Sequence, residues 1–146
     1  VITIDDDQIY SPKLIERLLL NYQNSRMVVA GNAPMMKHGL KLAEGFCGVL
    51  YPVCVFGSDF DTFIEDVVKC KQCFNMDDYF FSLYLKNHNI PVKSLDGQRS
   101  LRKDVAYGME ADALHKIDQA SQPDTRYKKC RMLLEEGEGT CELLKS

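Results

Sequence analysis

The start of the chain alternates hydrophobic runs with polar segments in the order of a βαβ unit, and this order constrains the fold more than any other feature. Residues 1–4 (VITI) are β-branched and uninterrupted, which is typical of a strand buried in a parallel sheet. An acidic loop follows, after which Ser11 and Pro12 suit the N-cap and the first position of a helix. Helical spacing over 14–24 and a second strand at 26–30 complete the unit. The pattern predicts an α/β protein.

Further along, four segments have the pattern of regular structure. Residues 44–52 (EGFCGVLYP) combine two glycines with an aromatic-rich strand, and residues 61–73 have the spacing of a helix. Asn75 or Asp77 is placed to cap a helix that ends near 88; this helix is apolar nearly all round and is therefore expected to be buried. Residues 90–95 predict a strand. The remaining expectations are an irregular segment at 98–108, helices at about 110–119 and 123–136, and a frayed tail at about 137–146.

Length and composition exclude several classes of protein. A chain of 146 residues corresponds to one domain, so residues 1–146 are expected to form a single unit. The formal net charge is −3, whereas a nucleic-acid-binding protein carries a basic stripe, so no nucleic-acid partner is expected. No apolar run approaches the length of about 20 residues that crosses a bilayer, so no transmembrane segment is expected in this chain.

The six cysteines are expected to be ordinary thiols. Cys70 and Cys73 form a single C-x-x-C sequence, and zinc would require a second ligand pair at comparable spacing, which the sequence does not offer. A disulfide and a metal or redox role remain the alternatives. Reduced thiols favour a cytoplasmic location.

Three adjacent carboxylates, Asp5, Asp6 and Asp7, follow the first strand. Neighbouring carboxylates repel by about 1 kcal/mol per pair in water and by more where the dielectric falls. Ligands of open α/β sheets collect at the carboxyl ends of strands, and residues two apart share a face, so Asp5 and Asp7 are expected to converge. Two such oxygens suit Mg²⁺ or Mn²⁺ when water and a substrate diphosphate complete the shell. The alternative is a solvated acidic turn.

A second acidic pair, Asp77 and Asp78, lies at the start of the predicted buried helix. The helix dipole stabilises a carboxylate there by about 0.3–1 kcal/mol. A carboxylate held at the mouth of a cleft in this way is suited to accept a proton. The alternative for either residue is a helix cap or a structural acid.

Together these motifs carry a resemblance to a known family. The D-D-D sequence after a hydrophobic strand, the Y-S-P that precedes a helix, GVLYP at 48–52, and DDY at 77–79 occur in that order. In this respect residues 1–92 resemble the GT-A glycosyltransferases, and especially their small bacterial and viral members with a D-x-D motif. The resemblance implies a partial GT-A (Rossmann-like) mixed sheet with flanking helices.

The resemblance also implies roles for the acidic residues. Asp5 and Asp6 would bind the nucleotide sugar, with Asp5 at the nucleotide or at a metal-bound water. Asp7 would ligate Mn²⁺ or Mg²⁺ directly, with Asp5 beside it. Asp78 would deprotonate the acceptor hydroxyl as the catalytic base, and Asp77 would assist it or bind the acceptor.

The resemblance implies roles for further residues. Gly45, Gly48 and Tyr51 would shape the acceptor side of the pocket, because glycine lets a sugar approach the backbone; the alternative is a strand followed by a turn. His115 would complete the metal shell, and the alternative is a surface histidine. His38 and His88 are expected at the surface.

A small basic cluster of Arg99, Arg102 and Lys103 lies in the segment expected to be irregular. These residues are suited either to closing over a diphosphate or to a solvated loop.

The family places a βαβα nucleotide-binding segment before the D-x-D strand, whereas this sequence begins at that strand. The chain is therefore expected to be the C-terminal, metal- and acceptor-binding part of a longer enzyme. The predicted function is a metal-dependent transfer of a sugar from a nucleotide-diphosphate sugar to a hydroxyl acceptor. The alternatives are a non-catalytic, carbohydrate-binding remnant and a response-regulator receiver, although the sequence lacks the receiver's acceptor Asp near 50 and its Lys-Pro near 100.

Overall fold

A computed structural model describes residues 1–6, 8–23, 26–36, 39–68, 73, 76–95 and the backbone of 102–104. The chain divides into two compact units. The first consists of 1–57 and 81–105, and the second of 58–80 and 106–146. The predicted helices at 110–119 and 123–136, the tail at 137–146, and His38 lie outside the described residues.

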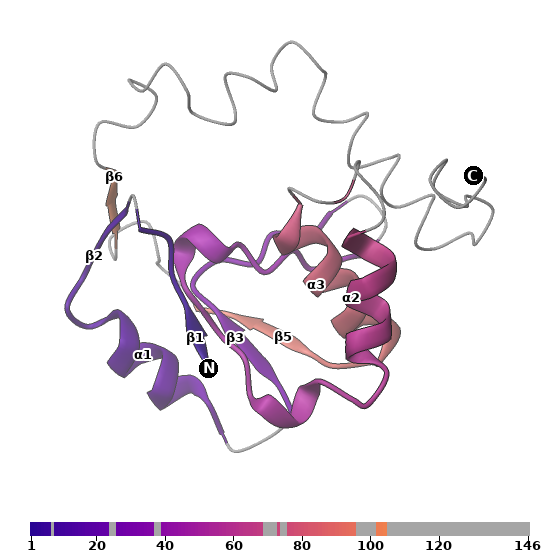
Figure 1. The fold of residues 1–146 in the computed structure, drawn as a ribbon. Helices are drawn as coiled ribbons and strands as arrows, with labels where there is room; N and C mark the ends of the chain where they lie inside the picture. Colours follow the sequence, from indigo (N-terminus) through magenta and orange to yellow (C-terminus); the bar gives the residue numbers. More distant parts are fainter. Residues whose placement is uncertain are drawn as a thin grey trace, which may run out of the picture. The chain divides into compact units, whose positions relative to one another are not determined.

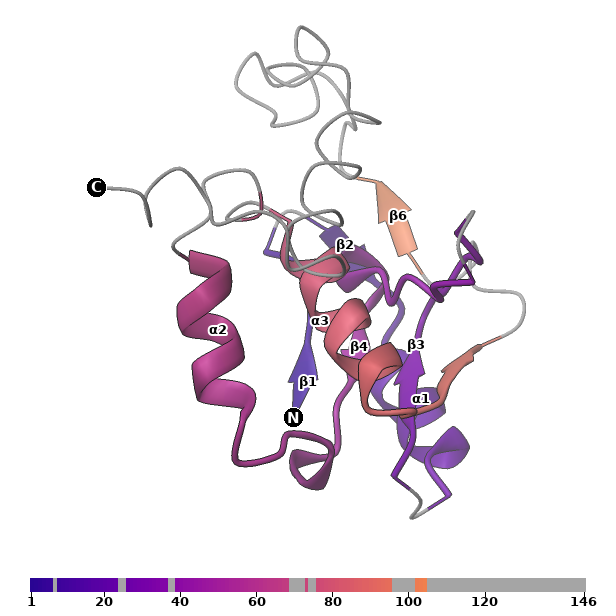
Figure 2. The ribbon, with the colours of Figure 1, turned by 90° about the vertical axis from the view of Figure 1, so that its right-hand side faces the viewer.

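A mixed four-stranded sheet forms the centre of the first unit (Figures 1 and 2). Its strands are β1 (Ile2–Thr3), β4 (Val49–Leu50), β3 (Val28–Ala30) and β5 (Val92–Ser94), in the order β1-β4-β3-β5. Strand β4 runs antiparallel to both β1 and β3, and β3 runs parallel to β5. Strands β1, β3 and β5 are therefore parallel to one another. The predicted α/β class is confirmed, with β4 lying between the two strands of the expected βαβ unit.

Strand β1 is shorter and more exposed than the sequence predicts. It is the outermost strand of the described sheet and pairs with β4 alone. Val1 is 69 % exposed and Ile4 is 53 % exposed. The expectation of a strand buried among parallel neighbours is therefore wrong, because one side of β1 has no neighbour within the described sheet.

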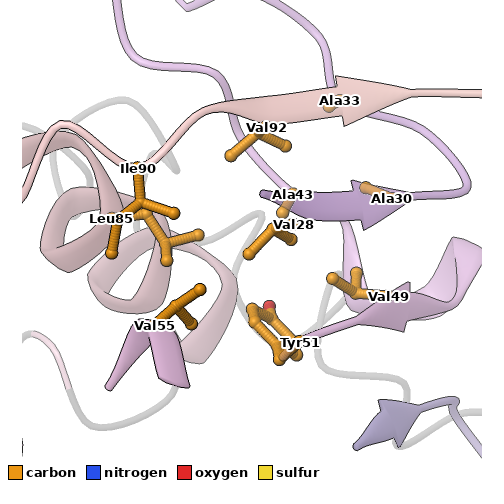
Figure 3. Close-up of a cluster of buried hydrophobic side chains, with 10 residues drawn as sticks. All are labelled: Val28, Ala30, Ala33, Ala43, Val49, Tyr51, Val55, Leu85, Ile90 and Val92. Carbon is orange, nitrogen blue, oxygen red and sulfur yellow. The ribbon is translucent and has the colours of Figure 1, made fainter. Parts of the chain in front are cut away.

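Side chains of the sheet alternate between two hydrophobic clusters, one on each face. Val29 and Leu50 belong to the cluster that contains Leu14 and Leu18 of helix α1 (Leu14–Asn21). The neighbours of Val29 and Leu50 along β3 and β4 belong to the opposite cluster, shown in Figure 3. Its members are Val28, Ala30, Ala33, Ala43, Val49, Tyr51, Val55, Leu85, Ile90 and Val92. The first unit thus has helical residues on both faces of its sheet.

Helix α1 begins later than predicted. Its N-cap residue is Lys13, and no side chain caps the helix. Ser11 instead forms a turn in which its Oγ accepts a hydrogen bond from the Lys13 N–H at 3.3 Å and its carbonyl oxygen accepts one from the Leu14 N–H at 2.9 Å. The predicted cap at Ser11 is therefore wrong, because the Ser-Pro sequence forms the turn before the helix.

A second, two-stranded sheet was not predicted. Strand β2 (Gln8–Tyr10) pairs antiparallel with β6 (Arg102–Asp104). The expected irregular segment at 98–108 thus contains a strand. Two 3₁₀ turns, η1 (Gly45–Cys47) and η2 (Val53–Val55), flank β4, so that the strand predicted over 44–52 is limited to Val49–Leu50.

The described helices agree well with the predicted ones. Helix α2 (Phe60–Val68) lies in the second unit, and the rest of its predicted range is outside the described residues or, at Cys73, non-helical. Helix α3 (Asp77–Asn87) begins in the second unit and continues into the first. Asn89 adopts a left-handed φ of 54°, which ends this helix as expected. Its predicted burial is confirmed at Tyr79, Phe80, Leu83, Tyr84 and Leu85.

The cysteines differ from expectation at one position. Cys73, whose side chain is fully buried, is part of a disulfide. Cys47 and Cys54 carry thiols, and Cys70, Cys130 and Cys141 lie outside the described residues. The prediction of ordinary thiols is therefore wrong for Cys73, and the argument that rested on it for a reducing compartment no longer applies to this residue.

Leu18 and Leu19 give a direct test of the packing of α1. Leu18 is fully buried against the sheet, whereas Leu19 is 53 % exposed. Leu18→Ala is expected to lower the free energy of unfolding by about 2–5 kcal/mol, because it leaves a cavity beneath the helix. Leu19→Ala, the matched control, is expected to change it by less than about 0.5 kcal/mol. Urea denaturation measures both, and equal effects would contradict this packing.

Candidate functional site

The acidic residues lie at the edge of the sheet where several strand ends meet. Because β1, β3 and β5 are parallel, their carboxyl ends lie at one edge, together with the amino end of β4. Asp5 and Asp6 follow β1, Gly31 follows β3, and η1 precedes β4 at this edge. In α/β sheets this is the edge at which ligands bind.

Asp5 and Asp6, here called the acidic turn, are joined to η1 by Tyr10 of β2. Its Oη accepts a hydrogen bond from the Asp5 N–H at 2.9 Å and donates one to the Phe46 carbonyl oxygen at 3.0 Å. One hydroxyl thus joins the residues after β1 to η1, forty positions further along the chain. The backbone of the acidic turn is therefore held in place by a contact that does not involve its carboxylates.

Close backbone packing between η1 and the end of β3 requires glycine at position 31. The Gly31 N–H donates to the Gly48 carbonyl oxygen at 2.7 Å. A Cβ at position 31 would lie 2.0 Å from the Cys47 carbonyl oxygen, which is far inside van der Waals contact. Residue 31 is therefore glycine because η1 crosses directly over the end of β3.

Gly48 also meets its own chain rather than open space. It has a φ of +82°, and a Cβ there would lie 2.9 Å from Leu14 Cδ2. The positive φ and the contact with Leu14 each explain why residue 48 is glycine, and neither explanation involves a ligand. The acceptor-binding roles of Gly45 and Gly48 stay predictions.

A third carboxylate, Glu44, lies near the same edge. Asn32 Nδ2 donates to Glu44 Oε2 at 2.6 Å, and the Glu44 N–H donates back to the Asn32 carbonyl oxygen at 3.1 Å. The Cys47 thiol donates to the same Oε2 at 3.9 Å. The uncharged amide of Asn32 and thiol of Cys47 therefore orient the Glu44 carboxylate. The negative charge of the acceptor strengthens both hydrogen bonds.

The predicted metal ligands are only partly covered by the structure. Asp5 and Asp6 are both exposed at the turn, whereas Asp7 and His115 lie outside the described residues. Among the described residues, no group of three or more His, Cys, Asp or Glu side chains is arranged to hold a metal ion. The structure thus provides two exposed carboxylates on a fixed backbone, and the complete ligand set stays a prediction.

The second acidic pair lies in the first turn of α3. Asp77 is exposed and Asp78 is half-buried, and both belong to the second unit. A helix N-terminus favours carboxylates electrostatically, which accounts for finding two of them there. Their catalytic roles stay predictions.

Tyr51 is a core residue in the structure. Only 5 % of it is exposed, and its ring lies 5.8 Å from the rings of both Phe56 and Phe81, measured between centroids. Figure 3 shows it within the cluster that covers one face of the sheet. The tyrosine of GVLYP therefore stabilises the sheet, and its predicted contact with an acceptor is untested. His88 is exposed as predicted, with its ring stacked on Tyr84.

Sequence reasoning missed three residues of this edge: Tyr10, Asn32 and Glu44. Each acts through a hydrogen bond between segments that are separated in the sequence, and no local pattern predicts such a bond. The Y-S-P sequence after the acidic residues was the only available signal, and it indicated a helix start rather than a tie between two loops.

Comparison with known proteins finds no matching family model, no matching curated protein and no matching solved structure. In the part of the chain that the structure describes, none of the helices has the length and apolar character needed to cross a membrane.

Tyr10→Phe tests whether the tyrosine hydroxyl holds the acidic turn. Losing the two hydrogen bonds is expected to cost about 1 kcal/mol of stability. It is also expected to accelerate hydrogen exchange of the Asp5 amide, which NMR measures. Tyr22→Phe is the control, because Tyr22 packs against the same hydrophobic cluster as Tyr10. Equal exchange of the Asp5 amide in the wild type and in Tyr10→Phe would contradict the assignment.

Proposed function

We propose that this chain is part of a metal-dependent glycosyltransferase that moves a sugar from a nucleotide-diphosphate sugar to a hydroxyl acceptor. The observation that carries the proposal is the acidic turn at the meeting point of the strand ends, with its backbone held by Tyr10. The mixed sheet agrees with the GT-A-like architecture that the sequence motifs imply. A fixed backbone supports the proposal because carboxylates on it lose little freedom when they bind a ligand.

The turn is proposed to hold a divalent cation. Its exposed carboxylate oxygens are hard donors, which suit Mg²⁺ or Mn²⁺ and leave room for water and phosphate oxygens in the shell. Asp7 and Asp5 would hold the ion with His115, and Asp6 would help to bind the nucleotide sugar. The ion would supply charge neutralisation at the departing diphosphate.

The proton acceptor is proposed to be Asp78. Asp78 is half-buried in the first turn of α3, whereas Asp77 is exposed, so the two residues have different environments. A general base requires a fixed position and restricted access to water, and Asp78 meets these requirements better than its neighbour. Asp77 would assist Asp78 or bind the acceptor.

The role of Asp7 is tested by donor binding. Asp7→Ala is expected to abolish Mn²⁺-dependent binding of nucleoside diphosphates and nucleotide sugars, because a direct ligand of the ion is removed. Isothermal titration calorimetry with and without MnCl₂ measures this. Glu16→Ala removes an exposed acidic residue from the first turn of α1 and is expected to leave affinity unchanged. Unchanged donor affinity in Asp7→Ala would refute the proposed metal ligand.

The role of Asp78 is tested by turnover. Asp78→Asn is expected to bind donor normally and to transfer sugar about 10²–10⁴-fold more slowly, as loss of a general base predicts. Asp61→Asn, which changes a first-turn aspartate of α2, is the control. Near-normal transfer by Asp78→Asn would remove it from this role. Donor binding without transfer in the wild type would favour the non-catalytic remnant instead.

A further inference from the structure

We infer that the disulfide of Cys73 is a structural crosslink that fixes the start of α3, the helix whose first turn carries Asp77 and Asp78. The order of this turn then depends on the redox conditions under which the chain folds. The inference goes beyond the proposed function, because it concerns the helix itself and holds whatever reaction Asp78 serves.

Backbone hydrogen bonds connect Cys73 to the start of α3. The Cys73 carbonyl oxygen accepts a hydrogen bond from the Met76 N–H at 3.0 Å. The Met76 carbonyl oxygen accepts hydrogen bonds from the N–H groups of Tyr79 at 2.9 Å and of Phe80 at 3.0 Å, within the first turn of the helix. A displacement of Cys73 would therefore disturb the residue whose carbonyl group begins the helix.

Burial holds this end of the helix in place. Met76, the residue directly before α3, has no side-chain oxygen that could accept the N–H groups left unpaired in a first turn. Cys73 is fully buried, and Met76 is only 7 % exposed. Phe80 packs against Phe63 of α2, with 6.4 Å between the ring centroids (Figures 1 and 2). A covalent bond at Cys73 thus acts on a buried attachment of the helix.

The crosslink forms by thiol–disulfide exchange. Cys47 and Cys54 carry thiols, so the partner of Cys73 is Cys70, Cys130 or Cys141. Two protein thiols and one glutathione disulfide give one protein disulfide and two molecules of glutathione, which take up the two protons and two electrons. Because a buried sulfur atom is shielded from attack, the bond forms while the chain folds, and this requires an oxidising compartment.

The experiment compares the oxidised and reduced forms of the same 146-residue chain. The chain is unfolded in urea with the phosphine reductant TCEP and is refolded either in TCEP or in a glutathione redox buffer. Peptide mapping by mass spectrometry without reduction identifies the disulfide and the partner cysteine. Hydrogen exchange measured by NMR is expected to be at least about tenfold faster at the Tyr79 and Phe80 amides of the reduced form. Its melting temperature is expected to be lower by about 5 °C or more.

Three variants separate the bond from the buried side chain. Cys73→Ala removes both the bond and the side chain. Replacement of the identified partner by Ala removes the bond and keeps Cys73, and it is expected to accelerate exchange of the same two amides. Cys54→Ala removes an exposed thiol and, as the control, is expected to change neither exchange nor melting. Loss of folding in both the reduced form and the partner variant, with Cys54→Ala folded, would also support a structural crosslink.

An oxidised chain without a disulfide at Cys73, or equal exchange of the two amides in the two forms, would overturn the inference. Acceleration in Cys73→Ala without acceleration in the partner variant would overturn it too, because the side chain and not the bond would then hold the helix. Each of these results leaves the proposed function intact. A chain that meets the expectations for exchange and binds no nucleotide sugar would support the crosslink and overturn the proposed function.

Discussion

The antiparallel pairing of β4 between β1 and β3 is the constraint on which the first unit depends. Both β1 and β3 bond to β4 and not to each other. Leu50 contributes to the cluster under α1, and Val49 contributes to the opposite one. This short strand therefore contributes to both hydrophobic layers, as β3 does, and holds β1 and β3 in register. Because β4 runs in the reverse direction, the chain enters it at the edge that holds the carboxyl ends of β1 and β3, where η1 crosses the end of β3.

That crossing explains the geometry of the candidate site. Turn η1 reaches β4 by passing over the end of β3, and Gly31 leaves it room there. The same turn offers the Phe46 carbonyl oxygen to Tyr10, whose hydroxyl in turn accepts the Asp5 N–H. The acidic residues are thus supported from the sheet through backbone groups.

The sequence predicted the elements with strong periodicity and failed where contacts between distant segments decide the outcome. Helix α3 is apolar nearly all round, and its burial and its end near Asn89 were predicted correctly. The cap of α1 was wrong because Ser11 is equally suited to a turn. The disulfide of Cys73 was also missed, because cysteine spacing alone does not identify a partner. At the candidate site, the sequence indicated the acidic residues after the first strand, but it did not indicate the hydrogen bond between the Asp5 N–H and the Tyr10 hydroxyl.

The sequence by itself determined the α/β class, because hydrophobic periods of two and of 3.6 residues are local properties. It also determined that acidic residues follow the first strand. Only the tertiary structure decided that β4 lies between β1 and β3 and that β6 pairs with β2. These pairings join residues about 20 to 100 positions apart, and backbone hydrogen bonds of this kind are open to any residue with an N–H and a carbonyl group. Side-chain patterns therefore do not select them. For β4, burial on both faces of the sheet favours the central position, since Val49 and Leu50 belong to opposite clusters.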